Sequence, residues 1–174
     1  MPDSRYVALL RGINVGTGKR IAMADLRAAF ESLGFTNVRT LLQSGNVVFD
    51  SESEPVVELV ETFIAKATGV SPRVLLLSDA SFRAIVDANP LREVSVDHSK
   101  AVVTFLEAMP ASVDRPAAAD LEPEILEVGK NALYQWLPDG TLATKIKPAF
   151  YKPLGLYTAR NLRTVDKLVA MLDA

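Results

Sequence analysis

The sequence predicts an α+β protein made of two linked halves, each built on a small sheet. Over residues 1–77 the apolar segments follow the order strand, helix, strand, strand, helix, strand, and a degenerate version of this order recurs in the second half. The first order is that of the split β-α-β, or ferredoxin-like, sandwich. The length of 174 residues, 49% of them hydrophobic, suits two small domains that share apolar surface. We therefore expect a ferredoxin-like subdomain at 1–78 and a second, degenerate one with extra C-terminal helices at 79–174.

In the first half, strand-length apolar runs alternate with segments whose apolar residues recur every three or four positions. Gly16, Gly34 and Gly69 interrupt or end these segments, and Pro55 suits the first turn of a helix. The expected elements are a strand at 5–13, a helix at 22–33, two strands at 38–42 and 45–50, a helix from Pro55 to Gly69, and a strand at 73–77.

The second half repeats the pattern with weaker signals. The expected elements are a helix at 79–88, a strand at 101–106, a short helix at 112–121, strands at 124–128 and 132–137, a helix capped by Thr141, and a last helix that begins near Thr158. Leu162, Val165, Leu168, Val169 and Leu172 form the apolar stripe of that last helix.

The composition removes most familiar catalytic groups. Cysteine is absent and histidine occurs once, at His98, so disulfides, thiolate nucleophiles and Cys/His zinc sites are excluded, and no cofactor or metal is expected. The first apolar run, residues 7–10, ends at Arg11 and is too short for a signal peptide, and no run is long enough to span a membrane. A cytoplasmic location is the default expectation, and the catalytic residues, if any exist, stay unassigned.

The net charge of −2 is unevenly distributed along the chain. Residues 1–50 carry 6 basic and 4 acidic side chains, residues 51–130 carry 7 and 14, and residues 131–174 carry 6 and 3. Two basic ends flank an acidic middle. If the ends meet, they form a positive patch that attracts a phosphate or carboxylate; the alternative is solvated surface charge.

Three motifs resemble one bacterial family. These are ALLRGINVG at 8–16, LLQSGNVVF at 41–49, and TARN at 158–161 followed by TVDKL at 164–168. In this order they resemble the signatures of the family catalogued as domain of unknown function 1697. The resemblance implies two linked ferredoxin-like subdomains and no particular activity. The chain departs from the family pattern at Leu162 and Arg163, where Trp and Asn are usual, so an aromatic stacking role there is not expected.

The Gly-rich segment 12–19 is the first candidate binding element. It is not a Walker A loop, because Gly12 lies one residue too early and Arg20 replaces the Ser/Thr that binds magnesium. Successive N–H groups in such a turn can still bind an anion, with basic side chains adding charge. The candidate ligand-binding residues here are Arg11, Asn14, Gly16 and Lys19; a plain connection between strand and helix is the competing interpretation.

Two further elements complete the predicted site. The turn residues Gln43, Ser44 and Asn46 supply amide and hydroxyl groups, although such residues are also ordinary in turns. Thr158, Arg160 and Asn161 are expected in the first turn of a helix, where a cation opposes the helix dipole unless an anion or a carboxylate lies nearby. We expect Arg11, Lys19 and Arg160 to converge on one anion.

These observations favour a binding module for a small anionic ligand, a nucleotide or a phosphorylated metabolite. RNA binding on a ferredoxin-like sheet is one alternative, but Asn46 and Val48 stand where stacking aromatics are needed and the net charge is negative, which argues against a nucleic-acid partner. A structural or protein-interaction domain is the other alternative. No membrane partner is expected, and the oligomeric state is left open.

Overall fold

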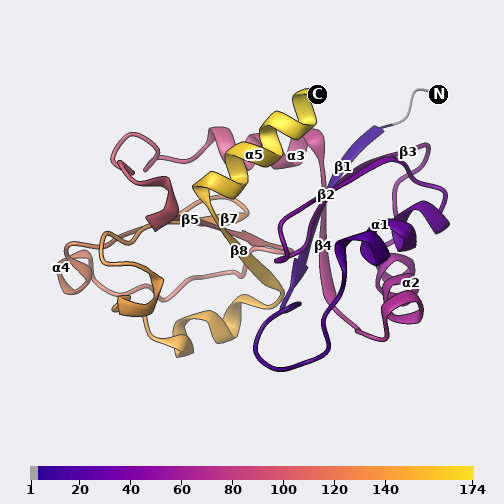
Figure 1. The fold of residues 1–174 in the computed structure, drawn as a ribbon. Helices are drawn as coiled ribbons and strands as arrows, with labels where there is room; N and C mark the ends of the chain where they lie inside the picture. Colours follow the sequence, from indigo (N-terminus) through magenta and orange to yellow (C-terminus); the bar gives the residue numbers. More distant parts are fainter. Residues whose placement is uncertain (1–3) are drawn as a thin grey trace. The chain divides into compact units, whose positions relative to one another are not determined.

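The computed structural model describes residues 4–174 and confirms the α+β class (Figure 1). The chain divides into two compact units. One ends at Phe82 and also includes Leu168–Ala174, and the other comprises Arg83–Lys167. Two helices, α3 (Asp79–Asp87) and α5 (Leu162–Asp173), begin in one unit and end in the other. Each unit contains one four-stranded antiparallel sheet.

The first unit has the ferredoxin-like topology, with sheet order β2-β3-β1-β4. Its elements are β1 (Ser4–Arg11), α1 (Met23–Ser32), β2 (Thr36–Leu41), β3 (Asn46–Ser51), α2 (Val57–Thr68) and β4 (Arg73–Ser78). Helices α1 and α2 contribute Phe30 and Ile64 to a core shared with Leu10, Val47 and Phe49 of the sheet. Strands and helices alternate here because the apolar period changes from two to about 3.6 at the glycines, as the sequence predicts.

The second unit repeats this topology with a thinner covering layer. Its sheet order is β6-β7-β5-β8, which matches the first sheet strand for strand. The strands are β5 (Ala101–Leu106), β6 (Ile125–Val128), β7 (Ala132–Trp136) and β8 (Tyr157–Asn161). Only the four-residue α4 (Ala118–Leu121) and the 3-10 helix Pro148–Leu154 stand where the first unit has helices of 10 and 12 residues.

Three sequence-based expectations about the second half are wrong in detail. The helix expected to be capped by Thr141 is only a three-residue 3-10 helix, Thr141–Ala143, whose N-cap is Gly140. The segment from Thr158 is strand β8, paired with β5, and the helix begins only at Leu162. Thr158 and Asn161 are both good N-cap residues, and the Asn161 side chain is the one that accepts the cap hydrogen bond, from Thr164 N at 3.0 Å. The helix expected over 112–121 shrinks to α4, because Pro116 excludes the earlier residues from an α-helix.

Candidate functional site

The loop between β1 and α1 is held in one conformation by Asn14. The Asn14 side chain donates to Ile21 O at 3.0 Å and to Gln43 O at 2.8 Å, and its Oδ1 accepts from Ile21 N at 2.7 Å. Asn14 itself has a positive φ of 55°, which asparagine tolerates better than most residues. The loop is therefore a closed and cross-linked turn rather than a loose connection.

The Gln43 turn packs directly against this loop. Leu10 N donates to Gly45 O at 2.9 Å, and a Cβ at Gly45 would lie 2.7 Å from Ile13 Cδ1. Gly45 also has a φ of +86°, so this position requires glycine for both backbone and packing reasons. The structure thus brings the Gly-rich loop and the Gln43 turn together, as two of the three elements of the predicted site.

Two predicted ligand-binding residues of this turn have structural roles. Asn46 is fully buried, and its Nδ2 donates to Leu41 O at 2.8 Å and to Ser44 Oγ at 3.1 Å. These bonds close the turn between β2 and β3 in the way that asparagine and serine side chains commonly do. Gln43 is exposed, and it accepts from Asn14 Nδ2 through its backbone oxygen at 2.8 Å and through its side-chain Oε1 at 3.4 Å.

The backbone of the loop alternates in a way that suits an anion. The values of φ are +72° at Gly12, +55° at Asn14 and +63° at Gly16, so every second residue is left-handed. Alternating backbone conformations turn successive N–H groups towards one side and form the concave anion sites known as nests. Within residues 4–174, no hydrogen bond has its donor at the backbone N–H groups of residues 13–17, and Gly16 and Thr17 form a turn.

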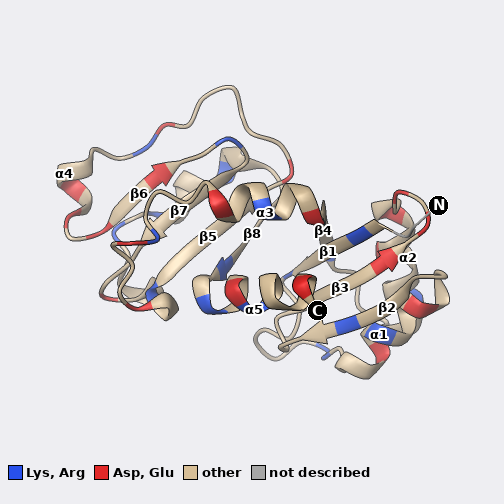
Figure 2. Cartoon of the chain, turned by 90° about the horizontal axis from the view of Figure 1, so that it is seen from above, with Lys and Arg blue, Asp and Glu red and all other residues tan. Residues whose placement is uncertain are grey.

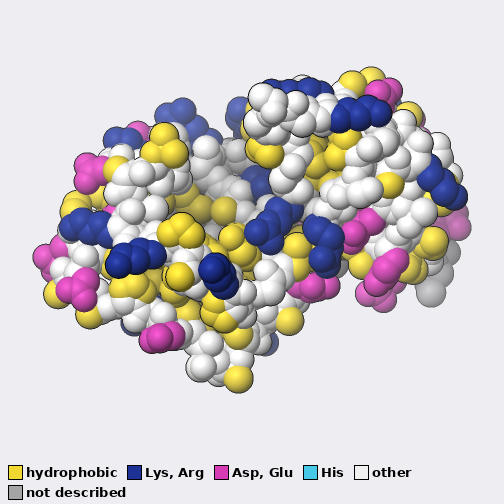
Figure 3. Space-filling view, turned by 90° about the horizontal axis from the view of Figure 1, so that it is seen from below, with side chains coloured by type: hydrophobic (Ala, Val, Ile, Leu, Met, Phe, Trp, Pro, Cys, Tyr) yellow, Lys and Arg dark blue, Asp and Glu magenta, His cyan; other side chains and the backbone are white. Residues whose placement is uncertain are grey.

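Basic side chains surround the same end of the sheet. Arg11 lies directly opposite Arg73 on the neighbouring strand β4, an arrangement in which like charges repel. The Arg73 guanidinium is 3.6 Å from Glu61, and the exposed Arg20 donates to Asn14 O at 2.6 Å. Figure 3 views the side towards which the loop projects in Figure 1, and shows Lys and Arg side chains on that side. The sequence pattern missed Arg73, since strand pairing alone brings it beside Arg11.

The Lys19 side chain lies against the C-terminal end of α2. A Cβ at Gly69 would lie 2.5 Å from Lys19 Nζ, so the ammonium group rests on the residue that ends α2. A cation at this end of a helix is stabilised by the helix dipole. Lys19 therefore has a structural role at the end of α2, and its contribution to a ligand in the loop is limited to its long-range charge.

The third predicted element belongs to the second unit and differs from expectation. Arg160 lies within β8, not in a helix turn, so the argument from an opposed helix dipole is wrong. The residue is only 9% exposed. Its guanidinium donates to Thr158 Oγ1 at 2.8 Å and to Ala159 O at 2.9 Å, and burial lowers the pKa of Arg160 to about 10. Thr158 and Asn161 serve, respectively, as its acceptor and as the cap of α5. That these residues share a ligand with Arg11 stays a prediction.

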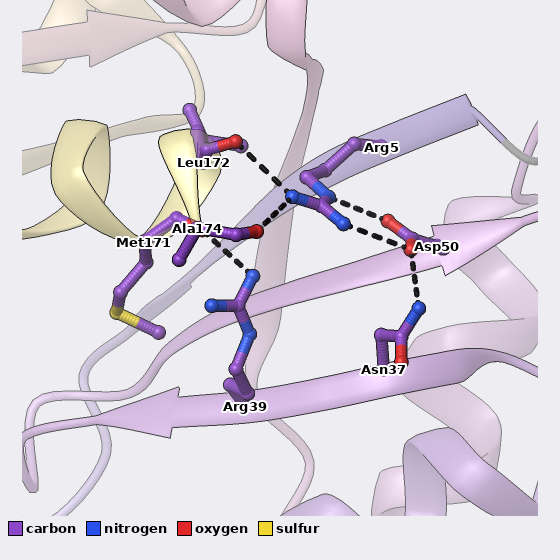
Figure 4. A network of polar contacts seen from close by, with 7 residues as sticks. All are labelled: Arg5, Asn37, Arg39, Asp50, Met171, Leu172 and Ala174. Atoms are coloured by element: carbon purple, nitrogen blue, oxygen red, sulfur yellow. Dashed lines mark hydrogen bonds and ion pairs between the residues drawn. The ribbon is translucent and has the colours of Figure 1, made fainter.

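A second basic cluster in the first unit is structural. Arg5 forms a bidentate pair with Asp50, at 2.7 and 3.1 Å, and donates to Leu172 O and Ala174 O, while Arg39 donates to Met171 O at 2.7 Å (Figure 4). Figure 2 shows basic segments on β1 and β2. The carbonyls at the end of a helix lack partners within it, so these arginines complete the last turn of α5.

The Asp50 carboxylate is the other member of this cluster. The hydrogen bond from Arg5 lowers the pKa of Asp50, burial opposes this effect, and a bond from Asn37 at 2.7 Å adds to the lowering. The cluster borders a pocket of 580 Å³, but its cations are committed to the carboxylate and to helix carbonyls. It fixes α5 on the first unit rather than offering a ligand site.

The fold and the loop define the class of this protein. It is a two-unit α+β protein in which both sheets have ferredoxin-like strand order and a basic Gly-rich loop follows the first strand. A family model described as "Protein of unknown function (DUF1697)" matches residues 4–134, and the chain belongs to this family.

A comparison with solved structures finds similar chains. The solved structure of the conserved bacterial protein SP0830 from Streptococcus pneumoniae is similar, with 30% sequence identity, a TM-score of 0.75, and coverage of 98% of this chain and 99% of that chain. No curated protein matches the chain. Over residues 4–174, no helix is both long and apolar enough to cross a membrane, and no group of three or more His, Asp or Glu side chains could hold a metal ion.

Proposed function

We propose that this protein binds a small anion, a phosphate- or carboxylate-bearing metabolite, at the loop of residues 11–20. The observation that carries the proposal is the alternation of left-handed residues at 12, 14 and 16, together with the N–H groups of residues 13–17, which make no hydrogen bond within residues 4–174. Neither the family nor the solved relative carries an activity in its description, so the loop is the whole support for this proposal.

The loop is preorganised for binding a ligand. The Asn14 side chain bonds to Ile21 at the end of the loop and to the Gln43 turn, so little conformational entropy is lost on binding. Arg11 lies opposite Arg73 across β1 and β4, and this end of the sheet therefore carries positive charge that attracts an anion. Arg20 adds charge while its guanidinium is held by Asn14 O.

The RNA-binding alternative gains no support from the first sheet. The face opposite α1 and α2 carries Val7, Leu9 and Val48, which are fully buried, where an RNA recognition motif needs exposed aromatic side chains. No observation favours a purely structural role over binding, since the loop's cross-linking is compatible with both.

Isothermal titration with pyrophosphate, inorganic phosphate and ATP at low salt tests the proposal. We expect saturable binding that weakens as salt rises, because screening reduces the attraction between exposed charges. Arg11→Gln should weaken the binding about tenfold, and Arg27→Gln, which removes the same charge from an exposed pair with Glu31 on α1, should leave it unchanged.

Asn14→Ala separates a shaped site from general electrostatic attraction. This variant keeps every charge but removes the bonds that close the loop, so binding should fall while the salt dependence stays the same. If no anion binds saturably, or if Arg11→Gln and Arg27→Gln behave alike, the proposal is wrong.

A further inference from the structure

The thin covering layer of the second unit leaves a cavity on its sheet. The cavity has a volume of 330 Å³ and lies over β5, β7 and β8. Pockets of about 300 Å³ and above are the usual size of small-molecule sites. Its lining consists of Val102, Thr104, Gln135, Leu137, Thr141, Thr144, Ile146, Pro148, Tyr151, Tyr157 and Ala159.

None of these lining side chains is charged, and two aromatic residues form one wall. Tyr151 and Tyr157 stack with ring centroids 5.3 Å apart, and Tyr151 OH lies 3.2 Å from Gln135 Nε2. Burial is the main cause that raises the pKa of Tyr151, so its hydroxyl stays neutral at physiological pH. The cavity therefore suits an uncharged molecule with a flat apolar body.

A buried carboxylate holds another part of the cavity lining in place. Glu124 is 5% exposed, and it accepts hydrogen bonds from Thr144 Oγ1 at 2.8 Å and from Lys145 N at 2.7 Å. These bonds fix the segment that contributes Thr144 and Ile146 to the cavity. Glu124 is satisfied by that segment and does not line the cavity itself.

Thr104 supplies a polar group without a partner. It is fully buried in the middle of β5, and its Oγ1 is the one buried side-chain polar atom that the described part of the chain leaves without a hydrogen bond. Such an atom carries a free-energy cost that a hydrogen bond would remove. Thr104 lines the cavity, so a bound molecule that reaches it could supply that bond.

We propose that this cavity binds an uncharged small molecule with an apolar ring and one hydrogen-bonding group, and that this group pairs with the Thr104 hydroxyl. The site lies entirely within residues 83–167 and does not depend on the loop of residues 11–20. The two proposals can therefore fail separately.

Titration with phenol, toluene and benzoate, followed through the methyl signals of Thr104, Val102 and Ile146 in NMR spectra, tests this inference. Phenol should shift these signals saturably. Toluene, which has the same ring without a hydroxyl, should bind about 3- to 10-fold more weakly, the difference expected for one neutral hydrogen bond. Benzoate should not bind, because its charge would be buried unpaired.

Two variants and a control complete the experiment. Thr104→Val keeps the side-chain shape and should abolish the preference for phenol over toluene. Ala159→Phe, at the exposed position that pairs with Thr104 across β5 and β8, should fill the cavity and block both molecules. Thr158→Val, on the other face of the same sheet, should change neither affinity.

Three results would overturn the inference: no saturable shift at these methyl groups with phenol, equal binding of phenol and benzoate, or an unchanged preference for phenol in Thr104→Val. Ala159→Phe keeps the test decisive if Thr104→Val does not fold, since unchanged binding in the Ala159→Phe variant would also contradict the proposal.

Discussion

Two identical substitutions in one sheet should change stability in opposite directions. Thr104 and Thr158 lie on the neighbouring strands β5 and β8, both are buried, and they face opposite sides of the sheet. The Thr104 hydroxyl has no hydrogen-bond partner among residues 4–174, whereas the Thr158 hydroxyl accepts from Arg160 Nη1 at 2.8 Å. Valine has nearly the same shape as threonine, so each substitution tests the hydroxyl alone.

Thr104→Val should stabilise the second unit. It removes a polar group that was taken out of water without compensation, a cost of roughly 1 to 3 kcal/mol, and adds an apolar methyl in its place. We expect a gain of about 1 kcal/mol, which corresponds to a rise in the melting midpoint of about 2 to 4 °C for a chain of this length.

Thr158→Val should destabilise the same unit. A hydrogen bond to a charged group contributes roughly 1.5 to 3 kcal/mol. Arg160 retains Ala159 O as an acceptor, so we expect a loss near the lower end, about 1.5 to 2 kcal/mol.

Urea denaturation followed by tryptophan fluorescence measures both effects. The single tryptophan, Trp136, lies on β7 of this unit and reports its unfolding directly. The two variants should differ by about 3 kcal/mol with unchanged slopes. If Thr104→Val proves less stable than the parent, the hydroxyl has a partner and the reasoning about this cavity is wrong.

Three further predictions, which use four substitutions, test the first unit. Gly45→Ala should lower the free energy of unfolding by roughly 2 to 4 kcal/mol, because Gly45 has a left-handed φ and a Cβ there would clash with Ile13. Gly12 is also left-handed but lies in open space, so Gly12→Ala should cost about 1 kcal/mol. Equal losses of stability in urea denaturation would contradict this account. Asp50→Asn should lose stability at neutral pH. Because the folded pKa of Asp50 is lowered, this deficit should begin to shrink as the pH falls below about 4 and should vanish only below the lowered folded pKa; a deficit independent of pH would show that Asp50 is not ionised in its pair with Arg5. Leu168→Ala, at a fully buried position of α5, should cost roughly 2 to 5 kcal/mol in thermal unfolding, and a loss under about 0.5 kcal/mol would mean that the stripe is exposed.

The sequence predicted the first unit better than the second for a physical reason. In the first half, apolar periods are long and glycines mark each change, so local pattern and tertiary structure agree. In the second half, the segment at 157–161 has only five residues, and its strand conformation depends on pairing with β5, which no local signal shows. Because of this pairing, Arg160 lies in a buried strand and not in the helix turn that the sequence predicts.

The candidate sites show a similar division. The contact between the Gly-rich loop and the Gln43 turn follows from strands that end at one edge, and the motifs indicated it. The pairing of Arg11 with Arg73 and the isolated hydroxyl of Thr104 depend on register and on what covers each face. In the sequence, Thr104 is one polar residue in an otherwise apolar strand, and nothing there reveals that it lacks a partner.

The most direct test of the central claim is a titration of the ¹⁵N-labelled protein with pyrophosphate, followed through backbone amide signals. If the loop is an anion site, the largest shifts should fall on residues 13–18, with a dissociation constant on the order of 1 mM or tighter, and Asn14→Ala should weaken them. Small shifts spread over all basic surfaces, or the largest shifts at residues far from this loop, would contradict the claim.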